Sequence, residues 1–164
     1  MSSRSWTRRP SLSARLAQVL AIAVPALALA GAYVSQYGFG LHPCEMCWWQ
    51  RWPHFAALAL ALLATQVRTN RPLLWLAGLA IAVSGAIGIF HAGVEYDWWE
   101  GITGCATLKL NGGSFYEAIQ AAPITRCDQA AFRFLTISMA GWNGLISIAS
   151  ALLIWTLLAR EKRR

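Results

Sequence analysis

Charged side chains are scarce in this sequence. They make up 13% of its 164 residues, whereas apolar residues make up 57% and nine residues are tryptophan. Water is therefore not the main solvent of this chain, and the composition is typical of a membrane protein rather than of a basic soluble one. The position of the net charge of +7 in the fold must therefore be established before a ligand is inferred from it.

Cysteine is also sparse, with four residues in the chain. Four are too few to staple a chain of this length in the manner of a small disulfide-rich domain. The sequence has no flavin or nicotinamide fingerprint, and Trp48 rather than histidine follows Cys47, which excludes a c-type haem attachment motif. The cysteines therefore either perform thiol chemistry or hold a metal.

Four long apolar runs divide the chain. We expect membrane-spanning helices at about residues 16–37, 48–67, 73–90 and 134–158, since about 20 apolar residues cross a hydrocarbon core of roughly 30 Å. The first run could instead be a cleaved signal peptide, because arginines precede it and small residues end it, but its length favours a retained helix. In the second run, Pro53 either lies in the first turn of a helix that begins near Trp52 or kinks a helix that begins earlier. In the third run, Gly78, Gly85 and Gly88 predict close packing against another helix.

The only long polar region lies between residues 92 and 133. Within it, Ser114 and Glu117 form a capping-box pattern, and Pro123 stops the segment that follows. This pattern predicts a short amphipathic helix, which lies either on the membrane surface or against its own loop. A shorter polar loop is expected at about residues 38–47.

The basic residues are distributed unevenly about the four runs. Only Arg51, Lys109, Arg126 and Arg133 lie on the side of the long polar loop, whereas the other ten lie at the termini and in the turn at residues 68–72. The positive-inside rule then places both termini of a multi-pass membrane protein in the cytoplasm. The net charge is thus an orientation signal, and we expect no nucleic-acid partner.

All four cysteines fall on the opposite, extracytoplasmic side. Cys44 and Cys47 precede the second run, and Cys105 and Cys127 lie in the long loop. That side is oxidising, so disulfides can form there. A zinc site is not favoured, because 21 residues separate the second pair, and no metal is expected. Two static disulfides remain an alternative, although Cys-x-x-Cys closes almost no loop entropy.

A helix that starts just after Cys44 would place Cys44, Cys47 and Arg51 on one face, with His54 one turn further. The helix N-terminus and the guanidinium would both stabilise a thiolate at Cys47. Arg51 could instead snorkel to lipid headgroups. Glu45 lies between the two thiols and would oppose a thiolate, but we expect its side chain to point to water.

A dithiol that oxidises other proteins must itself be reoxidised. The membrane offers a lipid-soluble quinone, and a quinone headgroup at the outer boundary would meet Cys47 and Arg51. It would also meet His91, which ends the third run on the same side. A histidine at a helix end can equally be an ordinary interfacial residue.

The order of these features resembles the DsbB family of membrane disulfide-forming proteins. The resemblance covers nearly the whole chain, from Pro43-Cys44-x-x-Cys47 and Arg51 through the two loop cysteines to Phe134-Leu135-x-Ile137-Ser138-Met139-x-x-Trp142. The related vitamin K epoxide reductase-like proteins carry the loop pair before the Cys-x-x-Cys pair, and here the order is reversed.

The resemblance implies a single all-α membrane domain over residues 1–164, built as a four-helix bundle. It also implies that a reduced, periplasmic DsbA-like partner with a thioredoxin fold attacks the Cys105–Cys127 disulfide at Cys105. Cys127 would then join Cys44 and free Cys47 to meet ubiquinone or menaquinone. The rival interpretation is a non-enzymatic membrane protein that uses its cysteines as metal ligands or as static cross-links.

Overall fold

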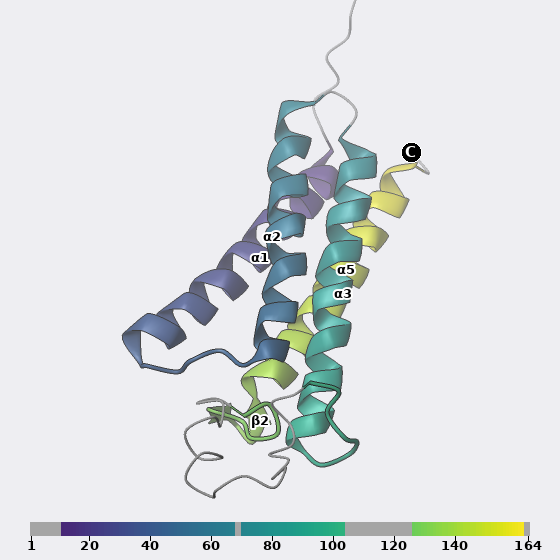
Figure 1. Ribbon diagram of the computed structural model, residues 1–164. Coiled ribbons are helices and arrows are strands. Elements are labelled where there is room, and N and C mark those ends of the chain that lie inside the picture. Colours follow the sequence, from purple (N-terminus) through teal and green to yellow (C-terminus); the bar gives the residue numbers. More distant parts are fainter. Residues whose placement is uncertain (1–10, 68–69, 104–125, 163–164) are drawn as a thin grey trace, which may run out of the picture.

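The computed structural model describes residues 11–67, 70–103 and 126–162 of the chain. Within these ranges it contains four long helices, which are α1 (Leu12–Gly38), α2 (Glu45–Gln66), α3 (Arg71–Glu95) and α5 (Met139–Lys162). A hairpin of β1 (Arg133–Phe134) and β2 (Ile137–Ser138) precedes α5 (Figure 1). The expected all-α bundle is confirmed. The predicted helix after Ser114 lies outside the described residues.

Three of the helices in the described ranges are long and apolar enough to cross a membrane, namely α1, α3 and residues Met139–Arg160 of α5. The second helix, α2, has 22 residues and lies alongside α3 (Figure 1). It is less apolar because Gln50, Arg51 and His54 interrupt its first half. The chain is thus a multi-pass membrane protein, and the crossing of α2 remains a prediction.

The start of α2 agrees with the alternative in which the helix begins well before Pro53. Cys44 is the N-cap, and its sulfur accepts a hydrogen bond from the backbone N–H of Cys47 at 3.3 Å. The helix therefore begins at Glu45 rather than at residue 48, with Pro53 in its interior. At the same end of the bundle, α3 continues to Glu95 instead of ending at residue 90. His91 consequently lies within a helix and not at its end.

The last helix begins later than predicted. Leu135 and Thr136 adopt positive φ angles of 49° and 67°, between strands that pair Arg133 with Ser138 and Phe134 with Ile137. Two consecutive left-handed residues cannot belong to a right-handed helix, although they suit the turn of a two-residue hairpin. The predicted start at residue 134 is therefore wrong, and α5 begins at Met139.

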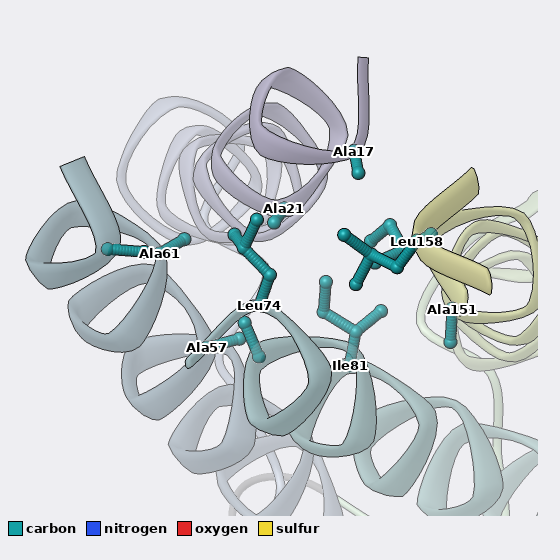
Figure 2. Close-up of a cluster of buried hydrophobic side chains, with 11 residues drawn as sticks. Ala17, Ala21, Ala57, Ala61, Leu74, Ile81, Ala151 and Leu158 are labelled. Carbon is teal, nitrogen blue, oxygen red and sulfur yellow. The ribbon is translucent and has the colours of Figure 1, made fainter. Parts of the chain in front are cut away.

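The core of the bundle is built largely from small side chains. Figure 2 shows Ala17 and Ala21 of α1, Ala57 and Ala61 of α2, Leu74 and Ile81 of α3, and Ala151 and Leu158 of α5 lying toward one another. Larger apolar side chains on the outside, such as Leu62, Leu79 and Leu152, are about half exposed. Small residues inside and leucines outside are expected when helices pack within lipid.

Glycine allows a close contact between α3 and α5. A Cβ atom added to Gly88 would lie 2.8 Å from the carbonyl oxygen of Ala140 and 2.9 Å from the backbone nitrogen of Gly144. Both neighbours are backbone atoms, so neither can rotate away. The close packing predicted for the small residues of the third run is confirmed at this position.

Gly88→Ala should therefore destabilise the bundle by about 1–3 kcal/mol, the usual cost of overpacking. Thermal unfolding in detergent micelles would measure the effect. Gly31→Ala on α1 is the matched control, because a Cβ there would meet no atom within 4 Å. Equal melting temperatures for the two variants would show that the α3–α5 contact is looser than described.

The first helix is tilted relative to the other three. It packs against α2 and α5 near the end of the bundle where α1 begins and α5 ends, and it diverges from them toward the end that carries residues 39–44 (Figure 1). At that wider end, residues of α1, α2 and α5 line a common cavity.

Candidate functional site

Two of the cysteines lie together at the N-terminus of α2. The sulfur atoms of Cys44 and Cys47 are 3.0 Å apart, and the Cys44 thiol donates to Cys47. Arg51 and His54, which follow on the same helix, are both buried and line the same cavity as the two thiols. The predicted common helix face is therefore present in the structure.

The two thiols are not equivalent. The hydrogen bond to Cys47 raises the pKa of Cys44, and burial raises it further. Cys44 is the donor and Cys47 the acceptor of this hydrogen bond, an arrangement that favours the thiolate at Cys47. This polarity makes Cys47 the more nucleophilic sulfur of the reduced pair.

A third cysteine comes from a distant part of the sequence. Cys127 has no solvent-exposed surface and belongs to a buried cluster with Cys44, Met46 and Val94. The hydroxyl of Thr103 donates to its sulfur at 3.4 Å. The structure therefore brings together three of the four cysteines singled out in the sequence, and Cys105 lies outside the described residues.

An ion pair flanks Cys127 at the surface. Arg126 donates to Asp128 through two nitrogens, and this pairing lowers the pKa of the Asp128 carboxyl. The Arg126 side chain is exposed, so the pair contributes little to stability.

Arg51 is held inside the protein. Its side chain is 6% exposed, and it donates to Gln36 Oε1 at 2.7 Å and to the carbonyl oxygen of Ala32 at 3.4 Å. The guanidinium also lies over the rings of Tyr33 and Trp48, at 5.0 Å and 4.9 Å from their centroids. It therefore does not snorkel to the headgroups. The Glu45 side chain is exposed, as expected.

A buried polar network links three of the helices, deeper in the bundle than the thiols. Gln50 Nε2 lies 2.8 Å from His91 Nδ1, Asn143 Nδ2 donates to Gln50 Oε1 at 2.9 Å, and Asn143 Oδ1 lies 2.9 Å from His54 Nε2. Ser84 completes the network by donating to the carbonyl oxygen of Gln50 at 2.8 Å. Gln50 and Asn143 were not predicted as site residues. Their polarity within apolar helices was the available signal, since such groups usually face a bundle interior.

His91 faces the thiols from α3. Its Nε2 atom lies 3.6 Å from Cys44 Sγ and 3.8 Å from Glu95 Oε1, and all three side chains are buried. Glu95 was also missed in the sequence, because it follows a long apolar run and looked like a loop residue. The ligand atoms of Cys44, Cys47 and His91 lie within 4.8 Å of one another, which is close enough for a metal ion.

A cavity of about 680 Å³ adjoins this site. Apolar residues of α1, including Val24, Leu27 and Ala28, line one side, and Cys47 and Arg51 lie on the other. Its size is that of a typical small-molecule site, and its lining combines apolar walls with a few polar groups. The geometry suits a small apolar ring that carries hydrogen-bonding oxygens.

Comparison with known proteins shows the family of this chain. The family model described as disulfide bond formation protein DsbB matches residues 14–157. Disulfide bond formation protein B of Polaromonas sp. is 27% identical over 92% of this chain and 93% of its own length. The protein of that name from Neisseria gonorrhoeae is 28% identical over 90% of this chain and 97% of its own.

An uncharacterized protein of Rickettsia prowazekii, RP370, is 26% identical over 90% of each chain. The comparison with solved structures gave no significant match. The family match covers most of the chain, including α2 with its two thiols and the buried Cys127. The chain therefore belongs to the DsbB family of disulfide bond formation proteins, which are membrane oxidoreductases.

Proposed function

We propose that this protein takes electrons from a reduced, DsbA-like thioredoxin-fold partner and passes them through its cysteines to a lipid quinone. It does so at the outer face of the bacterial inner membrane, with both of its termini in the cytoplasm. One observation carries the proposal: the Cys44–Cys47 pair opens into an apolar cavity beside the buried, charged Arg51.

The residues around the cavity suit a quinone. Its walls on α1 are apolar, as an isoprenoid-bearing ring requires, and buried polar groups are present on α2 at Arg51 and His54. A bound quinone supplies an acceptor for two electrons and two protons, and the dithiol is their donor. An arginine buried in an apolar segment is costly, so its retention here supports a role toward an oxygen that gains negative charge.

The position of Cys127 supports electron transfer from the loop pair. Partner oxidation leaves Cys127 as a thiol, and its attack on the Cys44–Cys47 disulfide forms a Cys127–Cys44 bond and releases Cys47 as a thiolate. Cys127 and Cys44 belong to the same buried cluster, which supports exchange between these two sulfurs. The partner would enter by attacking Cys105, which releases Cys127, and the partner's second thiol would then displace Cys105 as the oxidised partner leaves. Attack of Cys105 on the Cys127–Cys44 bond would restore the loop disulfide and release Cys44 as a thiol.

His91 lines the same cavity, but its two ring nitrogens face protein groups. One nitrogen contacts Gln50, and the other faces Cys44 and Glu95. We therefore propose that His91 contributes a wall of the quinone site and holds the Cys44 thiol in place.

The decisive measurement uses the purified full-length protein in lipid nanodiscs, with a reduced thioredoxin-fold substrate and either ubiquinone or menaquinone. We expect one substrate disulfide for each quinone reduced, because each event transfers two electrons. Quinone absorbance and free-thiol titration would follow the two sides of the reaction. No quinone reduction with either type would refute the proposal.

A metal-binding role is the second candidate, because Cys44, Cys47 and His91 present three ligand atoms at close range. Zinc analysis of the same preparation separates the two functions. A metal protein would contain stoichiometric zinc and would show no quinone-dependent loss of thiols.

A further inference from the structure

The side chain of His54 is the one member of the polar network that combines burial, a free ring nitrogen and a place on the cavity wall. It is 3% exposed and lines the cavity together with Cys47 and Arg51. Its Nε2 atom contacts Asn143, but its Nδ1 atom has no hydrogen-bond partner among the residues that the structure describes. A buried polar atom without a partner is costly and calls for an explanation, such as a ligand.

The network determines which nitrogen of His54 carries the proton. Asn143 Nδ2 faces the carbonyl oxygen of Ser84 at 3.3 Å, and a carbonyl can only accept. The amide of Asn143 is thereby oriented, and its Oδ1 atom also accepts from the Ser147 hydroxyl at 3.1 Å. The Nε2 atom of His54 must then donate to Oδ1. In the neutral imidazole, Nδ1 is consequently a bare acceptor.

Gln50 confirms the same orientation from the other end of the network. Its Nε2 atom donates to the carbonyl oxygen of Met46 at 3.2 Å, so its Oε1 atom is free to accept from Asn143. Two backbone carbonyls thus set the directions of both amides. The packing of the helices therefore determines the tautomer of His54.

We propose that His54 Nδ1 binds a hydroxyl group of the reduced quinone ring and so makes the site prefer quinol over quinone. The inference rests on the proposed function. A bare acceptor can hydrogen-bond the hydroxyl of a quinol, but it has nothing to donate to the carbonyl of an oxidised quinone. Cys47, Arg51 and His54 lie on one face of α2 over about 10 Å of helix rise, and all three line the cavity in which we propose that the ring binds.

The preference has a consequence for the overall reaction. Oxidation of Cys44 and Cys47 would form one S–S bond and release two electrons and two protons, which a bound quinone would take up. Where Cys47 is already a thiolate, the second proton would come from water. A site that binds quinol tenfold tighter than quinone raises the potential of the bound quinone by about 30 mV. His54 would thereby favour disulfide formation, while slowing release of the product.

Two substitutions of His54 distinguish the roles of its two ring nitrogens. His54→Gln places an amide near the position of Nε2, which keeps a donor for Asn143 but removes the acceptor at Nδ1. His54→Asn places the amide oxygen of a shorter side chain near the position of Nδ1 and loses the contact with Asn143.

In the full-length protein, the Kd of a short-chain ubiquinol and of its quinone would be measured by tryptophan fluorescence. Protection of Cys47 from alkylation would report binding independently of turnover.

For His54→Gln we expect the quinol Kd to rise up to about tenfold, the equivalent of one hydrogen bond, and the quinone Kd to change by less than about twofold. Product inhibition by quinol should weaken by the same factor, and His54→Asn should recover part of the loss. Unchanged quinol affinity, or equal loss of affinity for both forms, would overturn the assignment of His54. If the unsubstituted protein bound neither form, the proposed function itself would fail.

Discussion

Arg51→Gln should lower quinone-dependent turnover by about a hundredfold or more, with a large increase in the KM for quinone. The substitution removes the buried charge beside Cys47, which we propose stabilises both the thiolate and the oxygen that gains negative charge. Loss of one well-placed donor of this kind costs about 10²–10³ in rate in other enzymes. Steady-state quinone reduction in nanodiscs, with reduced partner in excess, measures both constants.

The control must separate chemistry from packing, because Arg51 also ties α2 to α1 through Gln36 and Ala32. Glutamine retains a donor, and a melting temperature near that of the unsubstituted protein would exclude unfolding as the cause. Arg51→Lys keeps the charge but loses the fork that reaches both acceptors, and we expect an intermediate KM. If Arg51→Gln left both turnover and the KM for quinone unchanged, Arg51 would have no part in the quinone site.

Cys127→Ala should abolish oxidation of the thioredoxin-fold partner, with a loss of at least about a thousandfold. Without this sulfur the loop disulfide cannot form, so the partner has no disulfide to reduce and no Cys127 thiol is released to attack the Cys44–Cys47 disulfide. Removal of a covalent nucleophile typically costs more than this factor. Partner oxidation would be followed by the loss of free partner thiols after addition of quinone. Alanine is preferred to serine, because Cys127 is fully buried and a hydroxyl there would need a hydrogen-bond partner.

The same variant should still reduce quinone when a small dithiol replaces the protein partner, because a small dithiol can reach the Cys44–Cys47 disulfide directly. This retained activity is the internal control for folding and for the quinone site. Loss of both activities would mean that Cys127 is a packing residue of the Cys44 cluster. Retention of both would mean that electrons reach Cys44 by another route.

The helical phase of the site was predictable because it is a local property. Cys44, Cys47, Arg51 and His54 are separated by three or four residues, and any helix that begins after Cys44 aligns them. The long apolar runs likewise predicted the helices. The ends of these helices differ from the predicted ends. The hairpin before α5 was missed, because Leu135 and Thr136 carry no sequence signal for a left-handed backbone.

The neighbours of the thiols were decided by tertiary structure. Cys127 reaches Cys44, and Asn143 reaches Gln50 and His54, across large separations in sequence. Such contacts depend on how each helix is rotated about its axis and on how closely two backbones approach at positions such as Gly88. The hydrophobic periodicity of one helix indicates neither its rotation against a neighbour nor the distance between the two backbones.

By itself, the sequence determined a membrane-embedded helical protein with a reactive dithiol beside a cation on one helix face, because composition and spacing act within single segments. Only the packing of α1, α2, α3 and α5 decided that Arg51 is buried and that a cavity lies beside Cys47. The same packing decided that His54, which lines this cavity, has a ring nitrogen without a hydrogen-bond partner among the described residues. These properties come from groups on different helices, and they exist only once those helices are in contact.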